Sequence, residues 1–207
     1  MQILAVVAVL ALLGVAGFVF FRGGDGHVVH RGKSGPPSAN LDLELGGIRN
    51  ESTGGPANLE QPAADQIMDL VGTYVDAGLI EPLKTGKPPN QDVFAIFDQN
   101  ATARLKSNDH TFVFEEGMPK LTGDLEAKAT PIILTALADP LGQIQLVTAS
   151  FVYDAVAPTK DGKFAINRSI ELTFVPDGQG SWKVTGYDVS VGRQPATATT
   201  TTAVPAS

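Results

Sequence analysis

The chain has 207 residues, no cysteine, 22 acidic against 15 basic side chains and a formal net charge of -7. This length predicts one domain with additional segments, and the lack of cysteine excludes disulfide scaffolds, thiolate metal sites and thiol nucleophiles. The acidic balance argues against a nucleic-acid partner, because such a surface needs a basic stripe. The charge is unevenly placed, since residues 60–193 hold 18 acids and 11 bases while residues 1–59 hold four of each.

An unbroken apolar run occupies residues 3–21, with no charged side chain and no Asn, Gln, Ser or Thr. As a helix this run would be about 29 Å long, which matches the hydrocarbon core of a bilayer. We therefore predict a transmembrane anchor over residues 1–21 that contacts the lipid bilayer through residues 3–21. The alternatives are a cleaved signal peptide, which the small residues at 15–17 would suit, and a buried core helix, which normally keeps a polar face.

The orientation of this anchor has arguments on both sides. Arg22, Arg31 and Lys33 follow the apolar run, and the positive-inside rule would place the rest of the chain in the cytoplasm. The body of the chain resembles that of a secreted protein, so we predict an extracytoplasmic domain of a single-pass membrane protein. Secretion after cleavage and a cytoplasmic-facing domain are the alternatives, and a compartment-sensitive reporter at the C-terminus distinguishes them.

Two low-complexity segments flank the body. Residues 22–61 contain nine Gly and three Pro, the composition of a flexible spacer, although alternating Leu and acidic residues at 41–45 would also fit a short strand. Residues 194–207 contain five Thr, four Ala and two Pro and no charge, which predicts a disordered tail. The domain itself is therefore expected over residues 62–193.

The first part of the body has the period of an amphipathic helix. Pro62 begins a segment with one apolar face, and Gly78 and Pro82 are predicted to end the helix. That face is formed by Ile67, Leu70, Val71, Tyr74 and Val75.

A second helix is predicted after a Pro-rich loop. Asn90 is its expected N-cap, and the turn-forming residues 106–109 are expected to close it. Its apolar positions are Val93, Phe94, Ile96, Phe97, Ala101 and Leu105. Phe112 and Phe114 would then begin a short third piece, extended or helical.

From residue 121 onward the apolar period changes to two, which is typical of strands. Turn signals, of which Asp161-Gly162 and Asp177-Gly178 are the clearest, separate these segments. Gly186 predicts a bulge in the last strand, and Pro131 requires an edge position or a bulge in the first. The four predicted strands cover residues 125–137, 144–157, 163–175 and 181–191.

These elements predict an α+β fold, with an N-terminal transmembrane helix followed by two to three helices on a curved four-stranded antiparallel sheet. Their order resembles the nuclear-transport-factor-2-like (cystatin-like, SnoaL-like) family over residues 62–193. The likeness rests on the helix at 93–105, the Asp161-Gly162 hairpin and the closing segment 180–187 around Trp182. The resemblance implies a cone-like cavity between sheet and helices, and in enzymes of this family an acid, a His or a Tyr lies inside that cone.

The same arrangement of anchor, spacer and domain resembles small membrane-anchored bacterial envelope proteins, including those associated with mammalian-cell-entry lipid transporters. This resemblance implies an envelope protein as partner. Oligomeric state does not follow from the sequence.

Three residues of the body are candidates for binding a ligand in such a cone. Tyr153 lies on the apolar face of its strand, His110 lies in a polar stretch that reads as a solvated turn, and Arg168 is a charge on an apolar face. Arg168 either pairs with an acid such as Asp154 or lines a mouth for anionic ligands. The neighbouring acids at 115–116 are expected to be solvated.

The motifs of common catalytic centres are missing from the sequence. It has no phosphate loop, nucleophile elbow or paired-carboxylate motif, and His27 and His30 lack a third metal ligand. We therefore predict no cofactor, no metal and no catalytic residue. The preferred hypothesis is a non-enzymatic, membrane-tethered module that binds or scaffolds partners at the cell envelope, and the alternative is a small-ligand-binding protein or enzyme that uses the cone.

Overall fold

A computed structural model describes residues 39–52 and 58–196 of the chain. The predicted membrane anchor and most of the Thr-rich tail lie outside these residues. Among the helices that are described, none combines the length and the apolar character needed to cross a membrane.

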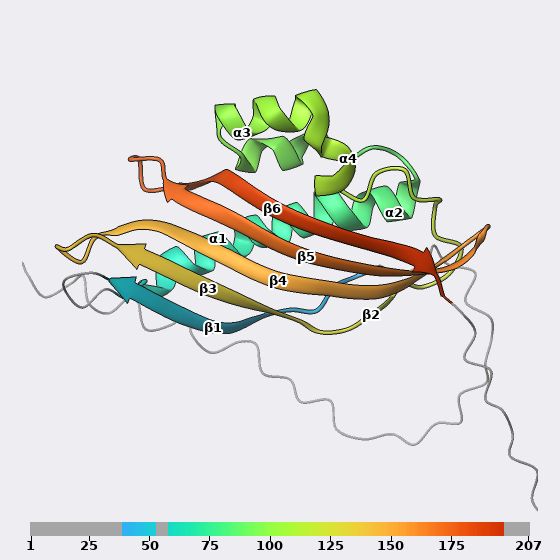
Figure 1. Ribbon diagram of the computed structural model, residues 1–207, viewed down its shortest axis with the longest axis horizontal. Helices are drawn as coiled ribbons and strands as arrows, with labels where there is room; N and C mark the ends of the chain where they lie inside the picture. Colours follow the sequence, from blue (N-terminus) through green and yellow to red (C-terminus); the bar gives the residue numbers. More distant parts are fainter. Residues whose placement is uncertain (1–38, 53–57, 197–207) are drawn as a thin grey trace, which may run out of the picture. The chain divides into compact units, whose positions relative to one another are not determined.

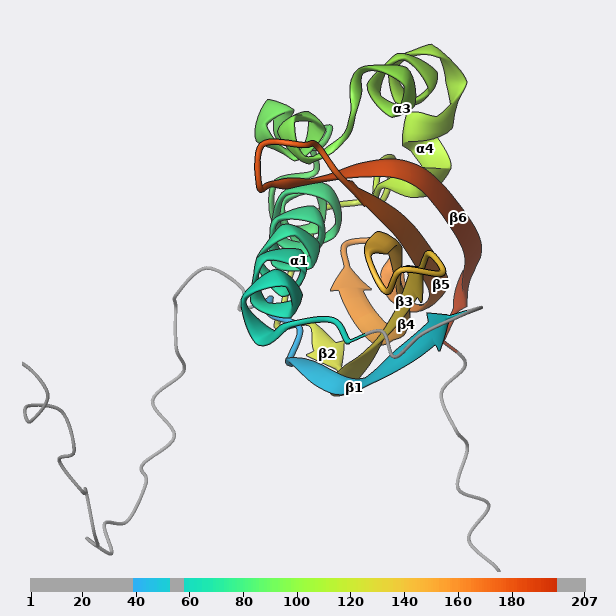
Figure 2. The ribbon, with the colours of Figure 1, turned by 90° about the vertical axis from the view of Figure 1, so that its left-hand side faces the viewer.

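Alternating apolar residues from 126 onward form most of a twisted sheet, as Figures 1 and 2 show. β4 is central, with β3 and the short β2 along one side and β5 along the other, and all of these pairs are antiparallel. β6 follows β5 at one end of the sheet. The strands are β2 (Glu126–Ala127), β3 (Thr130–Ala138), β4 (Ile144–Thr159), β5 (Gly162–Pro176) and β6 (Trp182–Pro195).

A further strand, β1 (Leu43–Ser52), pairs in parallel with β3 and makes the sheet six-stranded and mixed. The prediction of a four-stranded antiparallel sheet was therefore wrong, because β1 lies in the Gly-rich residues predicted to be spacer. A Cβ on Gly46 would lie 3.0 Å from the Pro131 Cβ. Glycine at this position therefore permits close approach of the two strands. In the sequence alone, a glycine needed for packing looks the same as a glycine of a flexible linker.

The predicted hairpin turns are confirmed. Gly162 and Gly178 both have a positive φ, and the Asp177 carboxylate accepts hydrogen bonds from the backbone N–H groups of Gln179 and Ser181. These bonds, more than any other cause, hold the pKa of Asp177 below its ordinary value. The predicted bulge at Gly186 is also present, as a register shift opposite residues 173 and 174 of β5.

The first helix continues beyond the two residues predicted to end it. α1 (Gln61–Tyr74) passes into a π-helical stretch (Val75–Ile80) and then into α2 (Glu81–Thr85), which Gly86 ends with a left-handed backbone. Pro82 lies at the first turn of α2, where the missing N–H costs little. A Cβ on Gly78 would lie 2.7 Å from the Phe114 ring, so this glycine serves packing and not termination.

The predicted second helix is divided in the structure. A 3₁₀ segment (Gln91–Ile96) begins at Asn90, whose side chain accepts from the Asp92 N–H, as expected of an N-cap. Asp98 then caps α3 (Gln99–Arg104) by accepting from the Ala101 N–H at 2.6 Å. A π-helical stretch (Leu105–Asp109) continues into α4 (His110–Val113), so residues 106–109 do not end the helix.

The helix that begins with α1 packs against one face of the sheet, here called the inner face, and the core lies between them (Figure 2). Odd-numbered residues of β4 and even-numbered residues of β5 face inward and are mostly buried. The opposite or outer face is turned toward the viewer in Figure 1 and carries the other set of side chains. This arrangement places both Tyr153 and Arg168 inside the core.

Candidate functional site

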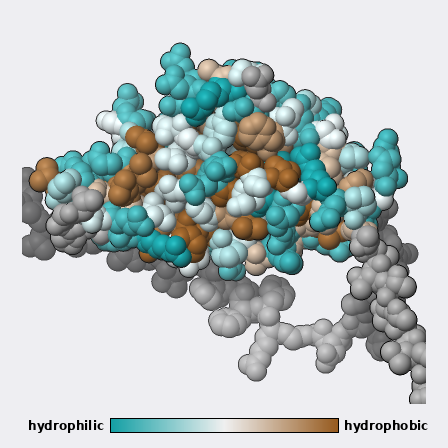
Figure 3. All heavy atoms as spheres, in the orientation of Figure 1, coloured by the Kyte–Doolittle hydropathy of each residue, from teal (hydrophilic) through white to brown (hydrophobic). Residues whose placement is uncertain are grey.

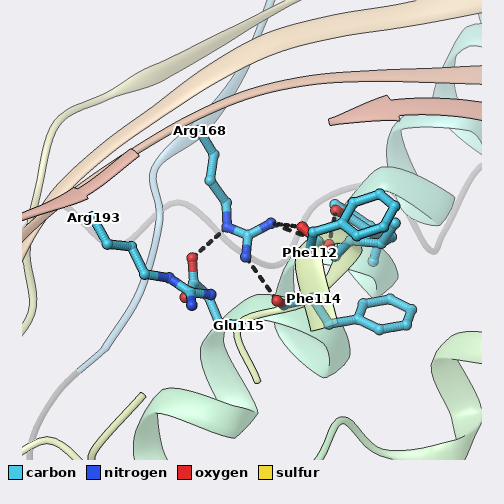
Figure 4. A network of polar contacts seen from close by, with 7 residues as sticks. Phe112, Phe114, Glu115, Arg168 and Arg193 are labelled. Atoms are coloured by element: carbon cyan, nitrogen blue, oxygen red, sulfur yellow. Dashed lines mark hydrogen bonds and ion pairs between the residues drawn. The ribbon is translucent and has the colours of Figure 1, made fainter. Parts of the chain in front are cut away.

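Arg168 is the largest fully buried side chain of the described residues, with an exposed fraction of 0%. Its Nε donates to Glu115 Oε1, and its Nη2 donates to the Phe114 carbonyl at 2.7 Å. Its Nη1 donates to the Phe112 carbonyl at 2.6 Å and to the Val113 carbonyl at 3.3 Å. As Figure 4 shows, one arginine of β5 thus binds the C-terminal end of α4 and the two residues that follow it.

The acid that pairs with Arg168 is Glu115, and it is 1% exposed. Its second oxygen accepts from Arg193 Nη2 at 2.8 Å, so two arginines share one buried carboxylate. Burial of a charge is tolerated only when it is paired and hydrogen-bonded, which this arrangement achieves on both sides. The expectation that residues 115 and 116 are both solvated was therefore wrong for Glu115.

Asp154, the acid suggested from the sequence as the partner of Arg168, lies on the other face of the sheet. It accepts from Asn167 Nδ2 and lies 3.6 Å from the Lys128 Nζ. Of the two interpretations of Arg168, an internal ion pair is the one observed, but with a different acid.

Two buried tyrosines lie near this ion pair. Tyr74 Oη donates to the Val113 carbonyl at 2.6 Å, which is the same carbonyl that Arg168 approaches. Tyr153 is opposite Arg168 in the β4–β5 register, and its hydroxyl has no hydrogen-bond partner among the described residues. Burial is the main cause that raises the pKa of both hydroxyls above the ordinary value of 10.0. Both side chains therefore stay neutral over the physiological pH range.

The two tyrosines allow the same substitution to be tested with opposite expected signs. We expect Tyr153→Phe to stabilise the protein by about 1 kcal/mol, because it removes a buried hydroxyl that lacks a partner, and Tyr74→Phe to destabilise it by about 1 kcal/mol. Denaturant unfolding, followed by the fluorescence of Trp182, the single tryptophan, measures both changes. A loss of stability in Tyr153→Phe would mean that its hydroxyl is bound in the folded protein.

His110 is not brought together with Tyr153 and Arg168. It is the first residue of α4, and its Nδ1 lies 2.5 Å from Glu116 Oε2. It lines an open pocket of about 210 Å³, together with Pro88, Pro89, Gln91, Phe94, Lys106 and Glu116. His110 and Glu116 form a hydrogen-bonded pair that lines this pocket, and Arg168 does not line it.

Two further pockets lie in the described residues, one of about 200 Å³ along β2, β4, β5 and β6 and one of about 470 Å³ beside Gly86 and Lys120. Neither these nor the His110 pocket is lined by Tyr153 or Arg168. Within the part of the chain that is described, no cluster of three or more metal-ligating side chains occurs. The contacts of Arg168 are internal to the fold. None of these three pockets gives access to its guanidinium.

Sequence reasoning missed Glu115 and Arg193 as members of this cluster. Glu115 directly follows Phe112, Val113 and Phe114, and an acid that ends so apolar a stretch is a signal for the partner of an arginine on an apolar strand face. Arg193 was missed because the last strand was predicted to stop at residue 191, whereas β6 runs to Pro195.

The chain was compared with models of protein families, with curated proteins and with solved structures, and none of the three comparisons gave a match. The resemblance to the nuclear-transport-factor-2-like family therefore stays a prediction.

Proposed function

We propose that the protein is a membrane-tethered, non-enzymatic module that binds or scaffolds a partner protein at the cell envelope, and that the partner docks on the outer face of the sheet. Two features of the site weigh against the alternative, a ligand-binding cone formed by Arg168, Tyr153 and His110. Arg168 directs its guanidinium at its own chain, and His110 lies apart from Tyr153. The tether is the predicted anchor at residues 3–21.

The observation that carries the docking surface is a group of apolar side chains on the outer face of β3 and β4, divided in the middle by a pair of threonines. Val152 is 49% exposed and Leu137 is 39% exposed, although both lie within strands. Leu137 is opposite Leu146, and Ile133 is opposite Ser150, two residues from Val152. We call Ile133, Leu137, Leu146 and Val152 the β3–β4 patch. Figure 3 shows the outer face, where hydrophobic side chains lie among polar ones, an arrangement typical of protein interaction sites.

A single charge placed on the β3–β4 patch tests this proposal. We expect Val152→Arg to reduce recovery of the partner at least tenfold in cross-linking pull-downs from intact cells, because about 1.4 kcal/mol of binding energy corresponds to that factor. Gln194→Arg is the matched control, since Gln194 is exposed on the same face of β6 and β5 separates it from the patch. The proposal is contradicted if both variants recover the partner equally. It is also contradicted if the unmodified chain recovers no partner above background.

A further inference from the structure

β6 is the last strand at one end of the sheet, and only part of its outer edge is covered. Phe97 forms a parallel bridge with Val184, the Asp98 N–H donates to the Val184 carbonyl at 2.9 Å, and Arg104 Nη2 donates to the Thr185 carbonyl at 3.0 Å. Beyond residue 187, no backbone group of residues 39–52 or 58–196 pairs with this edge of β6. Figure 1 shows β6 extending past α3 and α4.

The direction of the unpaired groups follows from one hydrogen bond. The Ala196 N–H donates to the Lys163 carbonyl at 2.8 Å, and the register with β5 is unbroken from there to Gly186. In an antiparallel pair, residues alternately turn their N–H and C=O groups toward and away from the neighbouring strand. Residues 188, 190, 192 and 194 therefore bond to β5, whereas Val189, Val191 and Arg193 present their backbone groups at the edge.

The two ends of the sheet differ in how they are protected. β1 has a register shift between Leu45 and Gly47 and exposed charges at Glu44, Arg49 and Glu51, which are the usual protections against pairing with another strand. Residues 188–194 of β6 contain no Lys, no Pro and no register shift over about 23 Å, and their two charges, Asp188 and Arg193, are of opposite sign. This edge is therefore open to a further strand.

We propose that the edge of β6 pairs antiparallel with β6 of a second copy of the chain, which extends the sheet across a two-fold axis at Ser190. In this register Val189 lies opposite Val191 of the second copy, and both are half-buried on the inner face, so each pair adds backbone hydrogen bonds and a valine contact. Asp188 lies opposite Gly192, so no like charges are paired. Residues 187–194 carry one acid and one base, which lets two acidic domains approach at this point.

The absence of native cysteine makes a direct cross-linking test available. Ser190 would face Ser190 of the second copy in a non-hydrogen-bonded pair, with Cα atoms about 4.5 Å apart, which is within disulfide reach. We expect full-length Ser190→Cys, purified in detergent and mildly oxidised, to form a disulfide-linked dimer. Ser169→Cys is the matched control, because Ser169 is exposed on the same face of β5 but would lie about 14 Å from its counterpart.

A second substitution separates edge pairing from random collision. Val191→Pro removes an N–H that β5 does not use, so the fold is retained while the edge is blocked, and we expect at least a tenfold loss of dimer in the Ser190→Cys background. Val191→Thr keeps the N–H and should retain the dimer. The proposal is overturned if Ser190→Cys cross-links no more than Ser169→Cys, which remains decisive even if Val191→Pro fails to fold. Failure here leaves the β3–β4 patch untouched, because that patch is tested by the recovery of a different protein.

Discussion

Replacing Arg168 with methionine is expected to destabilise the protein by about 3–5 kcal/mol, because it leaves Glu115 buried with only one partner and removes the donor to the Phe112 and Phe114 carbonyls. This loss approaches the whole stability of a small domain. Denaturant unfolding followed by Trp182 fluorescence measures it. If Arg168→Met does not fold, Arg168→Lys serves instead, since lysine keeps the charge but has fewer donors to bind the turn.

The matched control is Arg193→Met, which removes the other arginine of the same carboxylate. The Arg193 side chain is 28% exposed, and Glu115 keeps its bond to Arg168, so we expect a smaller loss on the order of 1.5 kcal/mol. Equal losses of stability in the two variants would contradict this view of the site. In that view Arg168 holds residues 112–114 against the sheet through their carbonyls, in addition to pairing with the carboxylate.

Phe114→Ala is expected to cost about 3–5 kcal/mol, because it empties the centre of an aromatic cluster. The Phe114 ring lies 5.7 Å from Phe94, 6.0 Å from Tyr74 and 6.3 Å from Phe97, measured between ring centroids. Phe112→Ala is the control two residues away, since Phe112 is 42% exposed and should cost below about 1 kcal/mol. Both variants keep the backbone carbonyls that accept from Arg168, so the comparison isolates the rings.

An effect of Phe112→Ala as large as that of Phe114→Ala would place both rings in the core and contradict the described packing. The same unfolding experiment with Gly78→Ala gives an internal check. The new methyl would meet the Phe114 ring, so its cost should largely disappear in the Phe114→Ala background, where the space is open.

Much of the strand structure could be predicted because it depends on neighbouring residues. The alternation of β4 and β5 and the Gly-containing turns after Thr159 and Pro176 are local features, and the structure confirms them. Helix ends were predicted less well. Gly78 and Pro82 are helix-breaking by intrinsic preference, but contacts of this helix with Phe114 and other core residues override that preference.

The candidate site shows the same division. Arg168 was recognised as unusual from its place on an apolar strand face, which is a local property. Its partner was not recognised, because Glu115 is 53 residues away in the chain and only the packing of α4 on the sheet brings the two together. The sequence suggested Asp154 because that residue lies close to Arg168 in the predicted hairpin. The pairing of neighbouring strands contains no information about an acid that comes from the helical layer.

The sequence by itself determined the acidic, cysteine-free composition, the apolar run at residues 3–21, the change from helical to strand periodicity and the turns between strands. Only the tertiary structure decided that residues 43–52 of the predicted Gly-rich spacer form β1, that the sheet is mixed, and which acid neutralises Arg168. The physical reason is that periodicity and turn chemistry act over a few residues. Parallel pairing and a buried ion pair depend on segments that are distant in the chain and meet only when the core is formed.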